Sequence, residues 1–133
     1  MIARDMSKVG FDLDLPEEQE QELIFQWAAY ESMAHPELRM LYAIPNGGKR
    51  SKATAARLKA TGVKPGVPDM CLPVPNANHH GLYIELKRKK GGKTSPEQQI
   101  WLGALSAFGY QAMICRGFDE AKTVICEYLG IKD

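Results

Sequence analysis

The sequence predicts an α/β fold in which a mixed β-sheet is flanked by helices. Apolar residues recur at helical spacing in several segments, and shorter apolar or alternating segments lie between them. Runs rich in glycine and proline separate the two kinds of segment. A chain of 133 residues, 44% of them hydrophobic, fits one compact domain with a packed core. We expect a single domain over residues 1–133, with its core at about residues 16–130.

The first half of the chain is predicted to contain two helices and one strand. A helix is expected from Pro16 through Ala34, a strand over residues 39–44 and a second helix over residues 52–60. Pro16 with two following glutamates is typical of a helix start, because proline fits the first turn and acids favour the positive end of the helix dipole. Ser51 is a suitable N-cap for the second helix, and Gly62 ends it.

The second half is predicted to contain three strands and two helices. The strands are expected over residues 69–72, 81–87 and 110–115, and the helices over residues 95–109 and 118–129. The segment 81–87 alternates, which places Tyr83, Glu85 and Lys87 on one face of a strand. Ser95 and Gln98 form the pattern of a capping box, with a first-turn proline between them.

Several residues that could carry chemistry are expected to have structural roles instead. Trp27 and Trp101 lie in apolar helical stripes, and Cys115 and Cys126 lie in apolar runs, so core positions are expected. The three cysteines lack a CxxC spacing, which argues against a disulfide framework or a zinc knuckle. His79-His80 follows a stretch rich in proline and asparagine, which favours a loop over a metal site.

The ends and the hydropathy of the chain indicate a soluble, intracellular protein without membrane contact. The N-terminal segment becomes acidic instead of entering the apolar run of a secretory signal. No apolar stretch approaches the ~18 residues that a membrane-spanning helix needs.

The net charge of +1 conceals two blocks of opposite sign. Between Val9 and Leu38 there are eight acidic residues and no Lys or Arg. Between Leu38 and Pro68 there are seven basic residues and no acid. A second basic cluster occupies residues 87–93. This distribution is compatible with phosphate binding on one face, although a solvated basic helix would also account for the first basic block.

Asp69, Glu85 and Lys87 form the pattern that points to phosphodiester hydrolysis. Glu85 and Lys87 are two positions apart on one strand, so their side chains share a face with Cα atoms ~6.6–6.8 Å apart. A carboxylate can then hold a divalent ion while the ammonium orients a water or meets developing negative charge. Asp69 begins the preceding strand and can approach from beside them. The E-x-K tripeptide alone is weak, and its combination with Pro68-Asp69 carries the prediction.

Three segments together resemble the VRR-NUC branch of the PD-(D/E)XK nucleases. They are Gly62-Val63-Lys64-Pro65-Gly66-Val67-Pro68-Asp69, then Leu82-Tyr83-Ile84-Glu85-Leu86-Lys87, then Ser95-Pro96-Glu97-Gln98 with Trp101. Ile44-Pro45-Asn46-Gly47-Gly48 and the basic helix after it are similar to phage-type, stand-alone members. The resemblance runs from about Glu17 to Leu129. It implies a restriction-endonuclease-like αβββαβ core with residues 52–60 as an added helix, and makes residues 1–133 one nuclease domain.

The resemblance also implies the roles of individual residues. Asp69, Glu85 and the main-chain carbonyl of Leu86 would hold Mg²⁺ or Mn²⁺, and Lys87 would orient the attacking water. Glu17 is the best match for an acid that the first helix brings to the metal, although Glu18 and Glu20 remain alternatives. Gln98 matches a polar residue facing the site, or it serves only as the capping-box partner of Ser95.

The activity implied is a structure-selective DNA endonuclease in the cytoplasm of a bacterial or phage-infected cell. The resemblance favours a homodimer that cuts branched DNA such as four-way junctions. Residues expected to contact phosphates are Asn46, Gly48, Lys49, Arg50, Lys52 and Arg57. The alternatives are a flap endonuclease or nickase, a nuclease-like module that only binds DNA, and an α/β interaction protein with a solvated strand face.

Overall fold

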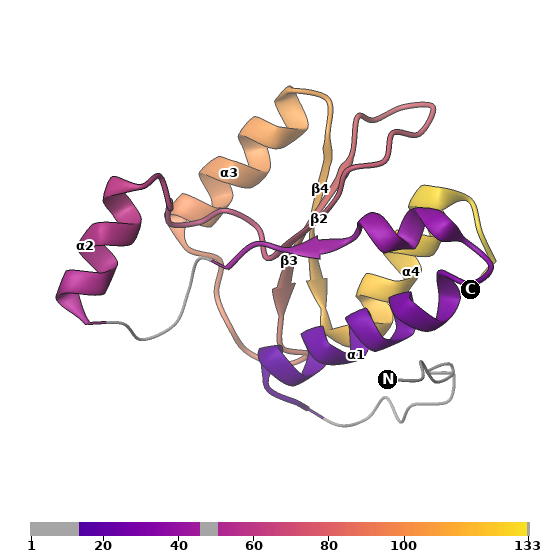
Figure 1. Ribbon diagram of the computed structural model, residues 1–133, viewed down its shortest axis with the longest axis horizontal. Coiled ribbons are helices and arrows are strands. Elements are labelled where there is room, and N and C mark those ends of the chain that lie inside the picture. The colour runs from indigo at the N-terminus through magenta and orange to yellow at the C-terminus, as the bar shows by residue number, and fades with distance from the viewer. Residues whose placement is uncertain (1–13, 46–50, 133) are drawn as a thin grey trace.

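The fold is a four-stranded mixed β-sheet with helices on both faces, as the sequence predicts (Figure 1). The structure is a computed structural model that describes residues 14–45 and 51–132. Its helices are α1 (Glu17–Glu31), α2 (Lys52–Ala60), α3 (Pro96–Ala107) and α4 (Gly117–Leu129), with a 3₁₀ helix η1 (Pro36–Met40). Its strands are β1 (Tyr42–Ala43), β2 (Met70–Leu72), β3 (Leu82–Lys87) and β4 (Gln111–Arg116).

The strands are ordered β1-β2-β3-β4 across the sheet. The pairs β1–β2 and β2–β3 are antiparallel, whereas β3 and β4 are parallel. The parallel pair needs a crossover, and α3 provides it. The central strand β3 therefore has neighbours on both edges and a helical layer over each face, which buries its side chains.

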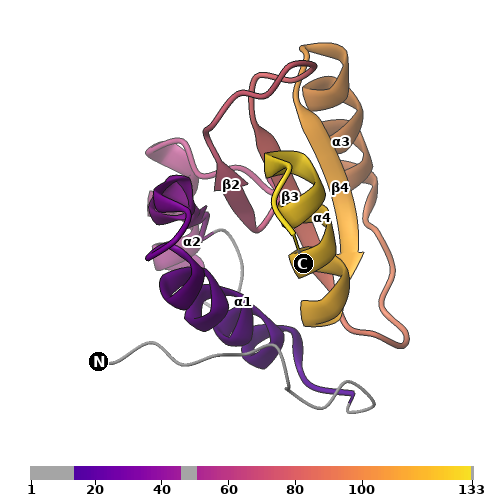
Figure 2. The same cartoon turned by 90° about the vertical axis from the view of Figure 1, so that its right-hand side faces the viewer.

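Helices α1 and α4 cover one face of the sheet, and α3 covers the other (Figure 2). The core lies on the α1/α4 side, where Leu82, Ile84 and Leu86 of β3 contact a cluster that includes Trp27 and Phe118. Among the described residues, no helix is long and apolar enough to cross a bilayer.

Two of the expected elements differ from the structure. The strand expected over residues 39–44 is reduced to Tyr42–Ala43, because η1 continues through Met40 and buries Leu38. The first helix ends at Glu31 and not at Ala34, which leaves Met33 67% exposed. Both errors arise next to Pro36, where a short apolar run fits either a strand or a tight helical turn.

The residues expected to pack are buried with one exception. Trp27, Cys115 and Cys126 belong to the core cluster. Trp101 is only half-buried and lies outside that cluster, so the core position expected for it is wrong. It lies on α3, and α3 covers the face of the sheet opposite the core.

Glu20 joins α1 to the start of α4. This carboxylate is 1% exposed, and its Oε1 accepts the backbone N–H of Phe118 at 3.3 Å. Gly117 has φ +82°, and a Cβ there would lie 2.5 Å from Glu20 Oε2. The acid therefore satisfies an N-terminal donor of another helix and fixes the packing of the two core helices.

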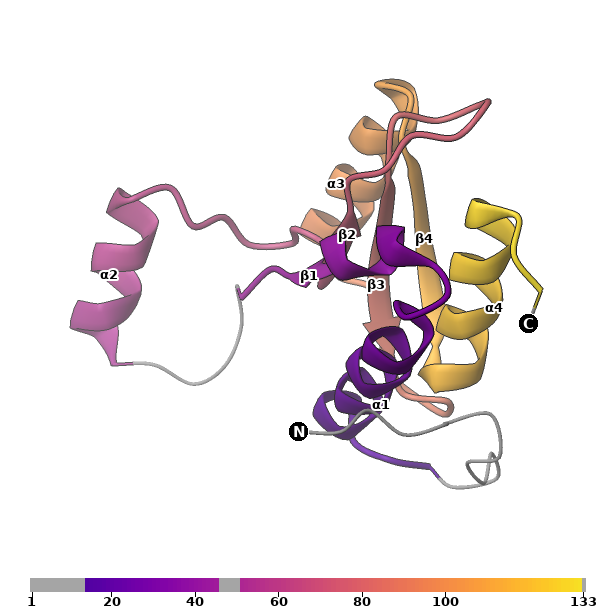
Figure 3. The same cartoon turned by 45° about the vertical axis from the view of Figure 1, so that its right-hand side comes forward.

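Helix α2 stands apart from the rest of the protein (Figure 3). It begins at Ser51, whose side chain accepts the N–H of Thr54, and none of its residues is buried. It makes no extensive contact with any other element of the described chain. A helix of nine residues gains little stability by itself, so α2 is an extended arm and not part of the packed domain.

The segment between α2 and β2 is pressed against the start of α3. Gly66 has φ +87°, and a Cβ there would lie 2.5–2.7 Å from the backbone and Cβ of Glu97. Only glycine allows both this conformation and this approach. The contact fixes the path of the chain shortly before it reaches Asp69.

We predict that Gly66→Ala destabilises the protein more than Gly62→Ala. Both positions have positive φ, and a Cβ at Gly62 meets no atom within 4 Å. Each substitution carries about 1–3 kcal/mol of backbone strain. Gly66→Ala should cost about 1–3 kcal/mol more, because the backbone of Glu97 cannot move aside easily. Chemical denaturation measures both values, and equal losses would contradict the close contact.

Candidate active site

Asp69 and Glu85 face each other across the end of the antiparallel pair β2–β3. Met70 is paired with Ile84 and Cys71 with Tyr83. Continuing this register by one residue sets Asp69 opposite Glu85, at the spacing of neighbouring side chains in a sheet. Ile44, which follows β1, lies on the side of Asp69 away from β3, where its N–H donates to the Asp69 carbonyl at 2.8 Å. The strand register thus produces the carboxylate pair expected from the sequence.

A main-chain hydrogen bond holds the Asp69 side chain in place. The Leu86 N–H donates to Asp69 Oδ2 at 2.6 Å. In the continued register Leu86 lies opposite Pro68, which has no N–H to extend the ladder. The lost donor would have faced the Leu86 carbonyl, whereas the carboxylate accepts the N–H of the same residue. The carbonyl of Leu86 leaves the strand on the same side, beside Asp69.

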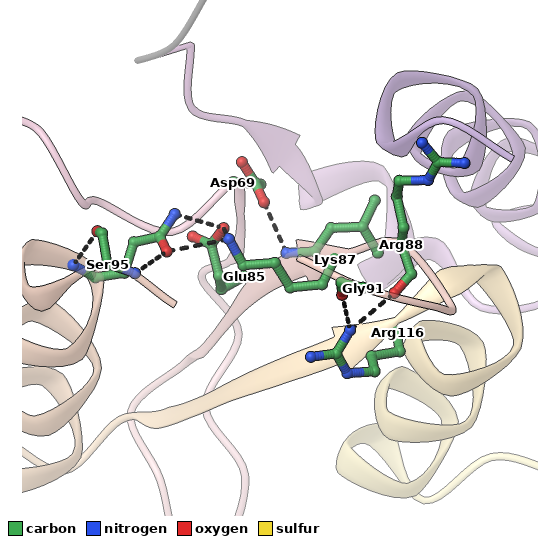
Figure 4. A network of polar contacts seen from close by, with 9 residues as sticks. Asp69, Glu85, Lys87, Arg88, Gly91, Ser95 and Arg116 are labelled. Carbon is green, nitrogen blue, oxygen red and sulfur yellow. Dashed lines mark hydrogen bonds and ion pairs between the residues drawn. The ribbon is translucent and has the colours of Figure 1, made fainter. Parts of the chain in front are cut away.

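Gln98 links Glu85 and Lys87, which are labelled in Figure 4, to the start of α3. Its Nε2 donates to Glu85 Oε2 at 3.0 Å, and its Oε1 accepts from Lys87 Nζ at 3.1 Å. The same Oε1 accepts the Ser95 N–H at 2.9 Å, while Ser95 Oγ accepts the Gln98 N–H at 3.1 Å. Gln98 is therefore both the capping-box residue of α3 and a residue that contacts the site. The sequence analysis left these two possibilities open, and the structure shows both contacts.

Glu85 and Lys87 are buried together under α3. Glu85 is 3% exposed and Lys87 6% exposed, and Lys87 Nζ lies 3.6 Å from Glu85 Oε2. Such a pair is stable in a buried place only because hydrogen bonds satisfy both groups. The ammonium is therefore held at a fixed position beside the carboxylates.

Burial raises the pKa of Glu85 to about 8, and the negative charge of Asp69 adds to this shift. Burial also raises the pKa of Asp69, against the opposing effects of the Leu86 N–H and Lys87. Two buried acids with raised pKa values form a donor set whose ionised form a divalent cation would favour. Nowhere in the described residues, this site included, do three or more His, Cys, Asp or Glu side chains converge as a metal site. The donors present thus fit an ion that keeps several waters.

The first helix brings acids to the same place. Glu17 and Glu18 line a cleft of about 620 Å³ together with Asp69. The charge of Glu17 contributes to the raised pKa of Glu85. Glu20 points instead to the start of α4, so it is not a candidate for the site. Of the three acids that the sequence left open, Glu17 and Glu18 therefore remain candidates for the site, and Glu20 does not.

Of the six residues expected to contact phosphates, the structure describes two. Lys52 and Arg57 are exposed on α2. Asn46, Gly48, Lys49 and Arg50 lie outside the described residues.

A second basic segment, residues 88–93, begins directly after Lys87. Arg116 Nη1 donates to the carbonyls of Arg88 and Gly91, which holds this loop against the end of β4. Sequence reasoning gave no role to Arg116, because the pairing of β3 with β4 that brings it there is visible only in the fold.

The comparisons with known proteins agree with the fold. A sequence model of the VRR-NUC domain matches residues 14–119. A solved structure titled "VRR_NUC domain protein" is similar over 91% of this chain and 93% of its own chain, with 27% sequence identity and a TM-score of 0.77. A search of curated proteins found no match.

We predict that Glu85→Gln stabilises the metal-free protein at pH 8. Glu85 has an ordinary pKa of 4.5 and a folded pKa of about 8, so the folded state retains a proton that the unfolded chain releases. Wild-type stability should fall as pH rises between these values. The gain from the substitution should be at least about 1 kcal/mol at pH 8 and small near pH 5.

Thermal unfolding in a chelator at the two pH values measures this gain. Glu127→Gln, on the exposed surface of α4, is the matched control. A stability difference between Glu85→Gln and wild type that does not change with pH would contradict the raised pKa.

Proposed function

The chain belongs to the VRR-NUC family, and we propose that it is a Mg²⁺- or Mn²⁺-dependent DNA endonuclease. Family membership implies nuclease activity. The observation that supports the metal and the reaction is the carboxylate pair Asp69 and Glu85, with the Lys87 ammonium 3.6 Å from Glu85. Hydrolysis of a phosphodiester needs a water, neutralisation of the phosphoryl charge and a stabilised leaving oxygen.

Asp69, Glu85 and the Leu86 carbonyl would hold the ion, with Glu17 or Glu18 near it. A bound Mg²⁺ or Mn²⁺ supplies charge neutralisation and lowers the pKa of a water. The Leu86 N–H keeps one oxygen of Asp69 occupied and turns the other toward the site. In the same way, the side-chain amide of Gln98 holds one oxygen of Glu85 by a hydrogen bond. The protein thereby orients its carboxylates before any substrate arrives.

Lys87 supplies the positive charge that meets the substrate. Its Nζ donates to the amide oxygen of Gln98 and lies beside Glu85, so its direction is fixed. A fixed ammonium in a water-poor site stabilises charge that develops on the phosphoryl group or orients the attacking water. Its flexible side chain would be much less effective without Gln98.

Helix α2 is the proposed surface for the DNA backbone. Its basic residues are Lys52, Arg57 and Lys59, it contains no acid, and it stands away from the sheet. An exposed helix with this charge and no apolar face to bury fits a polyanion better than a protein core. Such contacts position DNA without reading its sequence.

The preferred substrate that we propose is branched DNA, cut by a homodimer. A four-way junction presents symmetry-related strands, and one chain carries one Asp69–Glu85 centre. Paired incision in one encounter then requires two subunits, and two-fold dimers are the commonest soluble oligomers. A flap endonuclease, a nickase and a non-catalytic DNA-binding module are the alternatives that the experiments below distinguish.

We predict that Asp69→Ala and Glu85→Ala abolish cleavage and leave DNA binding intact. Lys87→Ala should slow the chemical step by about 10²-fold or more, through loss of a charge near the transition state. Labelled four-way junction, flap, duplex and single-stranded DNA with Mg²⁺ or Mn²⁺ provide the assay. Glu127→Gln is again the control, because it removes an exposed carboxylate of α4 that does not belong to the proposed site.

The same assay distinguishes the alternatives. Junction cleavage by a species of twice the chain mass in light scattering supports the dimeric junction nuclease. Flap cleavage by a monomer supports the first alternative. Cleavage by Glu85→Ala at the wild-type rate would disprove the site, and DNA binding by wild type without any cleavage would support the binding module.

We predict that Lys52→Ala with Arg57→Ala weakens binding to all DNA sequences alike. The plot of log affinity against log salt should become less steep by roughly one unit for each lost phosphate contact. Lys132→Ala, at the opposite end of the molecule after α4, should leave the slope unchanged. An unaltered slope in the α2 variant would show that this helix does not face the DNA backbone.

A further inference from the structure

A cleft lies between α1 and the first strand and ends at Asp69. Its volume is about 620 Å³, and α1 supplies one wall while Ala43, Ile44 and Pro45 supply the other. Asp69 belongs both to this cleft and to the carboxylate pair. The cleft is therefore continuous with the proposed active site, and a strand held there would place neighbouring nucleotides inside it.

Glu17, Gln21 and Phe25 follow one another at four-residue spacing along the cleft wall of α1. Residues at this spacing share one face of a helix. Eight residues correspond to about 12 Å of helix, so Phe25 lies beyond direct reach of a group bound by Glu17. What Phe25 meets is therefore not the reacting phosphate but a part of the substrate next to it.

The residues that line the cleft favour the binding of a nucleobase over that of a phosphate. Glu17, Glu18 and Glu22 are acidic, which disfavours a phosphate that no cation accompanies. Phe25 is half-buried, so one part of its ring packs on the core and another part faces the cleft. Ile44, opposite Asp69 in the strand register, adds an apolar surface.

Gln21 gives the cleft a polar group that suits the edge of a base. It is half-buried one turn before Phe25, and within the described residues its amide makes no hydrogen bond. An amide offers both a donor and an acceptor, as the edges of the bases do. An aromatic face beside an unpaired amide is the combination by which proteins hold unstacked bases.

We propose that this cleft is a nucleobase subsite, in which Phe25 stacks on an unpaired base flanking the scissile phosphate and Gln21 bonds to its edge. The inference rests on the proposed nuclease function and specifies its substrate. A base paired within a regular duplex cannot enter the cleft. The subsite therefore favours DNA that already has an unpaired nucleotide at the cut, such as a branch point or a single strand.

The test combines two enzymes with two substrates. Wild type and Phe25→Leu are assayed on a DNA that wild type cleaves, and on the same DNA lacking the base on one or other side of the mapped cut. Loss of one base–aromatic stack corresponds to about five- to 150-fold in affinity. Removing the base should slow wild type about tenfold in kcat/KM at one of the two positions, and slow Phe25→Leu by less than about threefold.

Two further variants keep the experiment decisive. Phe108→Leu alters an aromatic residue that is 70% exposed on the far end of α3, and it should show the full wild-type penalty. Gln21→Ala alters a half-buried polar residue and should fold even if Phe25→Leu does not. It should reduce the penalty for the missing base, because one contact to that base is gone.

The outcomes distinguish a failure of the nucleobase subsite from a failure of the proposed nuclease function. A smaller penalty in Phe25→Leu or Gln21→Ala than in wild type supports the subsite. Normal cleavage by wild type with no penalty at either position overturns the subsite alone, as does an equal penalty in wild type and both cleft variants. If wild type cleaves no DNA with Mg²⁺ or Mn²⁺, the proposed function fails and the subsite fails with it.

Discussion

The burial of Asp69 and Glu85, opposite each other at the end of β2 and β3, is the constraint around which the site is built. Burial raises the pKa of both groups, and the charge of Asp69 raises the pKa of Glu85 further, whereas the hydrogen bond with Glu85 lowers the pKa of Asp69. Hydrogen bonds offset part of the free-energy cost of this burial, since Asp69 accepts the Leu86 N–H and Glu85 accepts from Gln98 Nε2. The fold thus sets the pKa values of both acids away from their ordinary range, as is common at functional sites.

The start of α3 uses one set of hydrogen bonds for helix stability and for the geometry of the proposed active site. Ser95 and Gln98 cap the helix, and the same Gln98 side chain reaches Glu85 and Lys87. Gly66 presses against Glu97 in the same turn, which ties the segment before Asp69 to this helix. A change that loosens the start of α3 therefore moves both carboxylates and the lysine together.

Opposite charges are carried by separate elements. The acidic start of α1 lines the cleft beside Asp69, whereas the basic α2 stands away from the sheet. If the acids lay on α2, they would repel the DNA backbone, and if the basic residues lined the cleft, they would compete with a cation for the carboxylates. This separation is compatible with one face that draws DNA in and a small acidic centre that acts on it.

The sequence by itself determined the fold class and most helix and strand positions, and it predicted Asp69, Glu85 and Lys87 as the centre of the site. Local patterns sufficed here, because alternation placed Glu85 and Lys87 on one face and a capping motif marked α3. Register, burial and choice among similar residues were decided by the tertiary structure. Only strand pairing sets Asp69 opposite Glu85, and only helix packing sends Glu20 to α4 while Glu17 and Phe25 face the cleft. These depend on contacts between residues far apart in the chain, which no local spacing encodes.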